Sequence, residues 1–206
     1  MKKILKDALV LCCITLIAGV ALATVYAVTK EPIAAAELAA RAEAYRAVFA
    51  EAADFSADDA VDAAVQNSAE FCNAAGFAGV TVSDALYAVD EHGAVIGYVM
   101  TLNGKGYGGT IQFTMGVTAQ NTISGISVLS HSETAGLGAK CTDEAFSGQY
   151  AGKPAEQLTV VKTGATEDNE IDAISGATIT SVAITDAVNA GLQFAKTQMQ
   201  LGGAAQ

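Results

Sequence analysis

The feature that most constrains the fold is an uncharged apolar run near the N-terminus, ALVLCCITLIAGVALATVYAVT, which extends from Ala8 to Thr29. A helix needs about 20 apolar residues to cross the hydrocarbon core of a bilayer, so this run is long enough to span a membrane. Lysines precede the run, and the positive-inside rule therefore predicts a cytoplasmic N-terminus. We expect a single-pass protein of the cell membrane whose domain is extracytoplasmic, on the periplasmic or extracellular side.

A cleaved signal peptide is the alternative interpretation of the same run. The triplet at Ala21–Ala23 has the small residues of a cleavage site after a short apolar core. The apolar run continues beyond that site through Val25–Val28, which favours a retained anchor. The sequence alone leaves cleavage open.

The residues after the apolar run are strongly acidic. Residues 31–206 hold 7 Lys and Arg against 21 Asp and Glu, a net charge of −14. A surface of this kind repels phosphate backbones, so we exclude nucleic acid as a partner. The same charge keeps an exported domain soluble.

Cysteine spacing argues against the common metal centres. Outside the apolar run the chain has only Cys72 and Cys141, and no CxxC pair occurs. Zinc and iron–sulfur sites need clustered ligands, so we expect no metal site. Whether the two cysteines form a disulfide is open at this stage.

Three segments are expected along the chain: a cytoplasmic N-terminus with the transmembrane anchor (1–29), a juxtamembrane helix with a connecting segment (30–80), and a binding domain (81–200). In the second segment, EPIAAAELAARAEAYRAVF has strong helix formers, and Pro32 stands in the first turn, where its missing N–H costs little. The acidic stretch EAADFSADDAVDAAVQNSAEF follows and is predicted to be surface helix and loop.

The centre of the chain changes to the alternating period of strands. DALYAVDEHGAVIGYVMTLNG alternates around His92-Gly93, and TIQFTMGVTAQNTISGISVLSH alternates around Gln120-Asn121, which predicts two antiparallel hairpins. Between them GKGYGG, Gly104–Gly109, is either a flexible bend or backbone exposed to a ligand.

The C-terminal part returns to helical spacing. A short helix through CTDEAFSGQY and a strand in QLTVVKTG are expected before a long helix from about Thr178 to Gln198. The predicted fold class is therefore α+β, an antiparallel sheet packed by helices and preceded by one N-terminal transmembrane helix. The tetrapeptide SGAT lies where a loop enters the last helix.

The segment DAISGATITS, Asp172–Ser181, carries the strongest chemical signal. Four hydroxyl side chains cluster there without a base that could activate a nucleophile. The histidines are His92, on a predicted turn, and His131, and neither G-x-S-x-G nor a P-loop occurs, so we expect no catalytic residue. Helix capping explains only one hydroxyl. A helix N-terminus offers free N–H groups, which favours a phosphate-bearing ligand beside Thr178.

At this segment the sequence resembles the FMN-binding domain family of Rnf and sodium-pumping NADH:quinone oxidoreductase complexes. DAISGATITS matches the flavinylation motif of that family, and GYGGTIQFTMGV, ISGISVLSHSETAGLGAK and SGQYAGK occur in the family's order. The resemblance covers about residues 30–196, with the FMN-binding domain expected at 81–200. With one anchor and a domain of this size, the chain resembles the G subunit (RnfG) of electron transport complexes.

The resemblance implies that FMN is attached covalently, through its phosphate, to the hydroxyl of Thr178. In the family a flavin transferase forms this bond outside the cytoplasm from FAD with magnesium, so the domain needs no base of its own. The backbone of residues 177–179 is expected to hold the phosphate, while Thr180 and Ser181 are interpreted as caps or motif-recognition residues. The cofactor-binding residues carried over here are Asp172, Ser175, Gly176, Ala177, Thr178, Ile179 and Thr180.

A second motif, ETAGLG, implies contacts with the flavin ring, because this loop lies near the flavin in the family. The residues carried over are Glu133, Thr134, Gly136, Leu137 and Gly138. Leu137 is expected to pack on the ring. For Glu133 an alternative stays open, in which backbone N–H groups satisfy a purely structural carboxylate. Ala135 stands where many members have proline, which should alter loop stiffness rather than chemistry.

The resulting hypothesis is a membrane-anchored flavoprotein subunit that transfers electrons in an Rnf-type ion-translocating ferredoxin:NAD+ oxidoreductase, rather than an independent enzyme. Its implied partners are the other membrane subunits and the flavin transferase, and the phosphoester would make it a phosphoprotein. The alternatives are the C subunit of a sodium-pumping NADH:quinone oxidoreductase, a stand-alone extracytoplasmic flavin carrier or reductase, and a non-flavin binding module.

Overall fold

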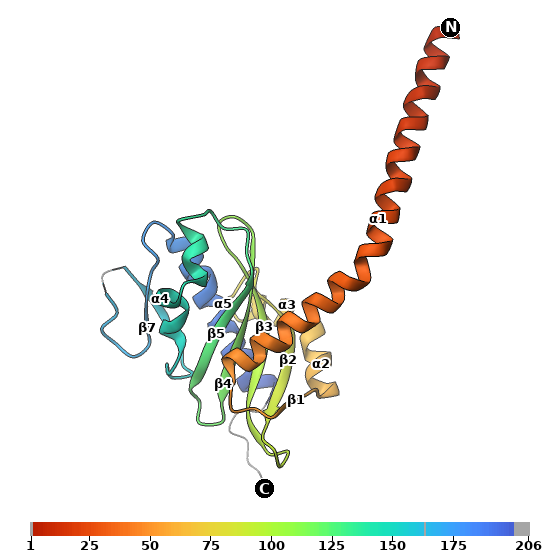
Figure 1. Ribbon diagram of the computed structural model, residues 1–206. Coiled ribbons are helices and arrows are strands. Elements are labelled where there is room, and N and C mark those ends of the chain that lie inside the picture. The colour runs from red at the N-terminus through yellow and green to blue at the C-terminus, as the bar shows by residue number, and fades with distance from the viewer. Residues whose placement is uncertain (1, 163, 200–206) are drawn as a thin grey trace. The chain divides into compact units, whose positions relative to one another are not determined.

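The computed structural model describes residues 2–162 and 164–199, and Figure 1 shows the order of its elements. The chain forms two compact units, Met1–Arg41 and Ala42–Gln206. The α-helices and short 3-10 helices are α1 (Lys2–Val48), α2 (Asp59–Gln66), α3 (Ser68–Ala74), η1 (Gly138–Thr142), α4 (Glu144–Ser147), η2 (Gly148–Tyr150) and α5 (Thr178–Gln198). The strands are β1 (Asp54–Ser56), β2 (Thr81–Val89), β3 (Val95–Lys105), β4 (Thr110–Thr118), β5 (Ile123–Ser130), β6 (Thr159–Val161) and β7 (Glu170–Asp172).

The N-terminal unit consists of α1 up to Arg41. α1 continues through Pro32, which corrects the expectation that a separate juxtamembrane helix begins there. Proline removes the hydrogen bond that its N–H would donate to Val28, but the alanine-rich sequence around it has high helix propensity. Within Ala8–Val48 the helix is long and apolar enough to cross a membrane. Large side chains such as Leu16 and Leu22 are exposed along it, as contact with lipid requires.

The second unit is built on a five-stranded antiparallel sheet in the order β1-β2-β3-β4-β5. Both predicted hairpins are confirmed, with Gly93 (φ 79°) in the β2–β3 turn and Asn121 (φ 60°) in the β4–β5 turn. Glycine and asparagine adopt this left-handed conformation most easily. The GKGYGG segment forms a third tight turn, because Lys105 pairs with Thr110 across it. β1 lies in the acidic stretch, where only helix and loop are predicted.

One face of the sheet packs against α5. Leu102 on β3 and its direct partner Phe113 on β4 are fully buried, as is Met115 two residues further along β4. α5 approaches closely at Gly191, where a Cβ would crowd the side chains of Leu102 and Met115. The helix spans Thr178–Gln198 as predicted (Figure 1), and this packing fixes it against the sheet.

The opposite face packs against the end of α1, which belongs to the same unit as the sheet. Phe49 lies over Gly97 and Gly116, where an added Cβ would crowd its ring. The Tyr45 hydroxyl lies 2.8 Å from the hydroxyl of Thr101 on β3. The two helices therefore cover different faces of one sheet.

A second sheet, of only two parallel strands, leads into the SGAT segment. β6 lies within the predicted strand QLTVVKTG, whose Thr163 lies outside the described residues, and β7 has no predicted counterpart. Cys72 and Cys141 are both buried and free, so they form no disulfide. The expected α+β class, an antiparallel sheet packed by helices, is confirmed.

Candidate functional site

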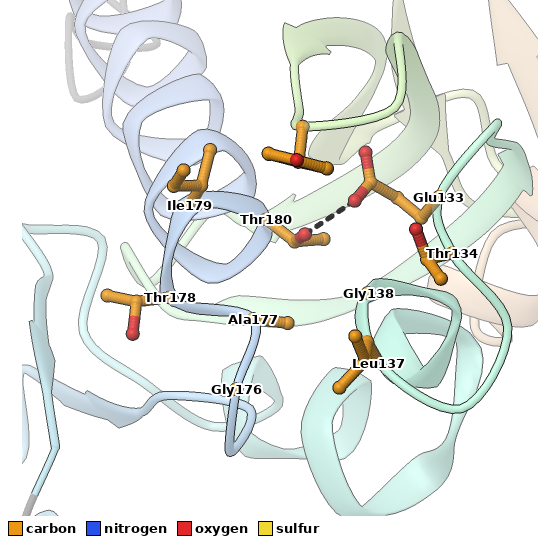
Figure 2. Close-up of a pocket in the computed structure, with 10 residues that line it drawn as sticks. Glu133, Thr134, Leu137, Gly138, Gly176, Ala177, Thr178, Ile179 and Thr180 are labelled. Atoms are coloured by element: carbon orange, nitrogen blue, oxygen red, sulfur yellow. Dashed lines mark hydrogen bonds between the residues drawn. The ribbon is translucent and has the colours of Figure 1, made fainter.

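A cleft of about 460 Å³ lies at the start of α5 (Figure 2). Its walls come from three segments that are distant in sequence, the β3–β4 turn, the loop after β5 and the first turn of α5. The lining residues are Tyr107, Glu133, Thr134, Leu137, Gly138, Gly176, Ala177, Thr178, Ile179 and Thr180. A volume of this size lies within the range of about 300–1,000 Å³ that is typical of small-molecule sites.

The first turn of α5 has no side-chain cap. The N-cap residue is Ala177, and the turn before it is made by Gly176 at φ 76°. Ser181 holds this loop, because its hydroxyl accepts the N–H of Ile174 at 2.9 Å and donates to the carbonyl of Ala177 at 3.1 Å. Neither Ser181 nor Thr180 therefore serves as the cap that the sequence allowed. The free N–H groups of an uncapped first turn are suited to an anion.

The two threonines of the motif have different surroundings. Thr180 is 1% exposed and donates to Oε2 of Glu133 at 2.6 Å. Thr178 is half-buried and lines the cleft, and its hydroxyl makes no hydrogen bond within the described residues. In Figure 2 its side chain points away from Glu133. Of the two hydroxyls, the one on Thr178 is accessible and uncommitted.

Glu133 joins the three walls of the cleft. It is 8% exposed, and its second carboxylate oxygen, Oε1, accepts the backbone N–H of Gly108 at 2.8 Å. The β3–β4 turn must be glycine here, because a Cβ on Gly106 would overlap Oε1 and one on Gly108 would overlap the carbonyl of Ser132. In the structural alternative, backbone N–H groups satisfy this carboxylate. One of its two donors is a backbone N–H, that of Gly108, and the other is the Thr180 hydroxyl on α5. The GKGYGG segment thus forms a bend that supplies this backbone donor, and exposure of its backbone to a ligand stays a prediction.

Burial raises the pKa of the nearby Cys141 thiol to about 11, and the Glu133 charge adds to the shift. Cys141 is completely buried. A neutral thiol of this kind is inert rather than nucleophilic. Cys141 therefore contributes packing to this region and no reactive group.

Most of the predicted site residues meet at the cleft. Nine of the lining residues are predicted ones, and the tenth, Tyr107, is missing from the prediction although its GYGG motif marks the turn. Gly136, Asp172 and Ser175 do not line the cleft. Gly136 forms a turn at φ 78° in the loop after β5. Contact between any of these residues and FMN stays a prediction.

Asp172 holds the chain that leads to the motif. Its Oδ1 accepts the N–H of Ala165 at 2.8 Å, and its own N–H donates to Oε1 of Gln149 at 2.7 Å. With Ser175 it lines a separate groove of about 220 Å³. In this structure the carboxylate of the motif is thus a support for the loop between β6 and β7.

The cleft combines an apolar mouth with an anion-binding helix start. Tyr107, Leu137 and Ile179 are 73%, 45% and 58% exposed, and exposed apolar side chains around a cavity are typical of ligand sites. A planar aromatic group with a phosphate tail fits this lining, because the apolar side chains suit the ring and the uncapped turn suits the phosphate. Within residues 2–162 and 164–199, no three His, Cys, Asp or Glu residues cluster as a metal site would require.

Two known protein families match this chain. The FMN-binding domain matches residues 106–193, a range that contains every residue lining the cleft, and the RnfG N-terminal region matches residues 1–48. Together they include the apolar part of α1 and the whole of the candidate site. The match to the FMN-binding domain supports FMN as the cofactor of this chain.

Two curated relatives match nearly the whole chain, and a third matches about half of it. The chain is 32% identical to the G subunit of the ion-translocating oxidoreductase complex of Methanosarcina acetivorans, over 96% of this chain and 97% of that protein. It is 35% identical to the G subunit of the Na+-translocating ferredoxin:NAD+ oxidoreductase complex of Acetobacterium woodii, over 93% and 91%. With the G subunit of the proton-translocating complex of Clostridium ljungdahlii the identity is 40%, over 54% of this chain and 60% of that protein.

Among solved structures, the NqrC of Shewanella oneidensis is similar at 27% identity with a TM-score of 0.49, over 58% of this chain and 61% of that one.

The two relatives that match over most of their length carry the same subunit designation. The protein therefore belongs to the RnfG family, the G subunits of ion-translocating oxidoreductase complexes.

Proposed function

We propose that this protein is a membrane-anchored redox subunit that carries FMN as a phosphoester on Thr178. The observation that carries the proposal is the contrast between two threonines of one motif. The Thr180 hydroxyl is buried and bonded to Glu133, whereas the Thr178 hydroxyl is accessible at the uncapped start of α5. The hydroxyl that the family motif marks for attachment is thus the one that the fold leaves available.

The residues around the cleft divide the work of holding FMN. The backbone N–H groups of the first turn of α5 would hold the phosphate, because they lack internal partners and lie at the positive end of the helix dipole. Leu137, Ile179 and Tyr107 would cover the ring system with apolar surface. When bound, FMN supplies one- and two-electron redox chemistry, while the protein supplies position and electrostatics.

The site needs no catalytic base, since attachment would be the work of a flavin transferase. Thr178 would supply the oxygen of the new P–O bond, the pyrophosphate bond of FAD would break, and AMP would leave. The hydroxyl proton would pass to the transferase. Thr178 is therefore proposed as a substrate residue.

The anchor and the family point to a role within a larger complex. The apolar part of α1 would hold the protein in the cell membrane, with its N-terminus cytoplasmic and the FMN domain outside. Relatives are named as subunits of ferredoxin:NAD+ oxidoreductase complexes, one coupled to sodium and one to protons. We infer a place for this chain among the membrane subunits of such a complex, which transfers electrons and translocates ions.

The attachment is tested by co-expressing the full-length chain with a flavin transferase. Thr178→Ala is expected to abolish flavin fluorescence in the denatured protein band completely, because the acceptor oxygen is gone. Thr159→Ala, which makes the same change on an exposed strand residue, is the matched control and should keep full fluorescence. Intact mass should show one added FMN, less one water, in every fluorescent protein.

Covalent flavin in Thr178→Ala would overturn the assignment of the acceptor. A wild-type chain that binds FMN but releases it on denaturation would retain the FMN-binding function and disprove the phosphoester. The place in a complex is tested separately, by purifying the intact protein from membranes and identifying the subunits that accompany it.

A further inference from the structure

Among the ten residues that line the cleft, Glu133 has the one charged side chain. The other nine are glycine, alanine, threonine, tyrosine or aliphatic residues. The two groups that donate to its carboxylate, the Gly108 N–H and the Thr180 hydroxyl, are both neutral. A full negative charge is thus held at the wall of an otherwise uncharged cleft.

The same carboxylate fixes the geometry of the cleft. Oε1 binds the β3–β4 turn and Oε2 binds the first turn of α5, while the residue itself belongs to the loop after β5. Gly138 leaves room for this arrangement, because a Cβ there would overlap both Oε2 of Glu133 and Oγ1 of Thr180. Figure 2 shows the carboxylate directed at Thr180 across the cleft wall. One side chain therefore ties the three walls together.

We propose that Glu133 is a positioning residue with two separable effects. Its hydrogen bonds set the first turn of α5 against the β3–β4 turn, and its charge lowers the reduction potential of the flavin held in the cleft. The second effect follows because an added electron meets a fixed negative charge, and a charge that is largely buried is screened little by salt. The proposal rests on FMN binding in this cleft but does not require the covalent bond.

The field of this carboxylate reaches at least one other buried group in the structure. After burial itself, Glu133 is the largest cause that raises the pKa of the Cys141 thiol. The thiol is neutral at neutral pH, and an anion at that position would be opposed by the carboxylate. A bound group that gains negative charge would be opposed in the same way.

Two variants separate the effect of the Glu133 charge from that of its hydrogen bond to Thr180. Glu133→Gln removes the charge but keeps both contacts, because the amide oxygen can accept from Gly108 and the amide N–H can donate to the Thr180 oxygen. Thr180→Val removes the bond to α5 and keeps the charge. Glu156→Gln, on an exposed residue that does not line the cleft, is the matched control for loss of one carboxylate.

The midpoint potential of the flavin-loaded full-length protein is measured by spectroelectrochemistry. Glu133→Gln is expected to raise the midpoint potential by ~59 mV, which corresponds to a tenfold change in the one-electron equilibrium constant. Thr180→Val should move the potential much less and should instead speed amide exchange in the first turn of α5 severalfold. Glu156→Gln should leave both unchanged.

An unchanged or lower potential in Glu133→Gln would overturn the proposed effect of the charge. Unchanged amide exchange in Thr180→Val would overturn the claim that the hydrogen bond to Glu133 positions the first turn of α5. A shift of equal size in Glu156→Gln would assign the potential to the acidic surface and not to Glu133. If Glu133→Gln fails to fold, Glu133→Asp serves, since it keeps the charge and must retain the low potential. Flavin binding by the wild-type protein is measured first. If the wild type binds no flavin, the proposed function itself is wrong, and this outcome is distinct from any difference between the variants.

Discussion

The two faces of the central sheet are built from different residues. The face toward α5 is paved with large side chains such as Leu102, Phe113 and Met115. The face toward the end of α1 has glycine at positions 97 and 116, and its apolar cluster is smaller, with Val99 as its fully buried residue on β3. Alternate residues of the same two strands thus form a large core on one face and a flatter packing surface for the end of α1 on the other.

The two faces therefore have different tasks, since one holds the core and the other receives the end of α1. The α5 face supplies the main core and positions the first turn of α5, where Thr178 lies. The α1 face needs only to receive one helix end, and its glycines let the Phe49 ring lie against the backbone of β3 and β4. We therefore expect damage to the first face to destroy the site, whereas damage to the second should release the helix end and spare the site.

The largest effect is expected for Phe113→Ala on the α5 face. Phe113 is fully buried, and truncation of a core phenylalanine costs about 3–5 kcal/mol in the free energy of unfolding. Urea unfolding of the full-length protein in detergent, followed by circular dichroism, measures the loss, with Val95→Ala, exposed on β3, as the control within about 0.5 kcal/mol. A loss below about 1 kcal/mol, the size of an ordinary substitution, would mean that the α5 face is not the main core.

A smaller and more local effect is expected for Gly97→Val on the α1 face. The new side chain would overlap the Phe49 ring and the carbonyl of Val117, and overpacking of this kind costs about 1–3 kcal/mol. We expect faster amide exchange in residues 42–49, with covalent flavin retained. Gly125→Ala is the control, because a Cβ there meets no atom within 4 Å. Loss of flavin attachment in Gly97→Val would show that the two faces are coupled.

The features that could be predicted from the sequence are those that depend on local signals. The hairpins around Gly93 and Asn121 and the bounds of α5 are predictable because turn residues and hydrophobic periods act locally. The motif around Thr178 is predictable because its residue types are unusual for a plain helix start. In each case the necessary signal lies within a short consecutive stretch of the chain.

What the sequence does not specify depends on distant or very short pairings. The bond between Glu133 and Thr180 joins residues 47 positions apart, and no period indicates it. Tyr107 enters the cleft because the β3–β4 turn folds toward the loop after β5. The strands β1, β6 and β7 have three residues each, too few for a pattern of alternation. Pro32 misleads for the opposite reason, since a local breaker is overruled by the helix formers around it.

The smallest effect is expected outside both faces, in the loop between β6 and β7, for Glu170→Gln. Hydrogen bonds from the N–H groups of Thr166 and Glu167 lower the pKa of the Glu170 carboxyl. A lowered pKa in the folded state means that this carboxylate stabilises the loop above the ordinary pKa of glutamate and loses the effect as the pH falls through the folded value. Because the side chain is exposed, the change should be confined to exchange of these two amides. The ratio of exchange rates between Glu170→Gln and wild type should exceed one at neutral pH and approach one in strong acid, whereas a ratio independent of pH would exclude the carboxylate as the cause.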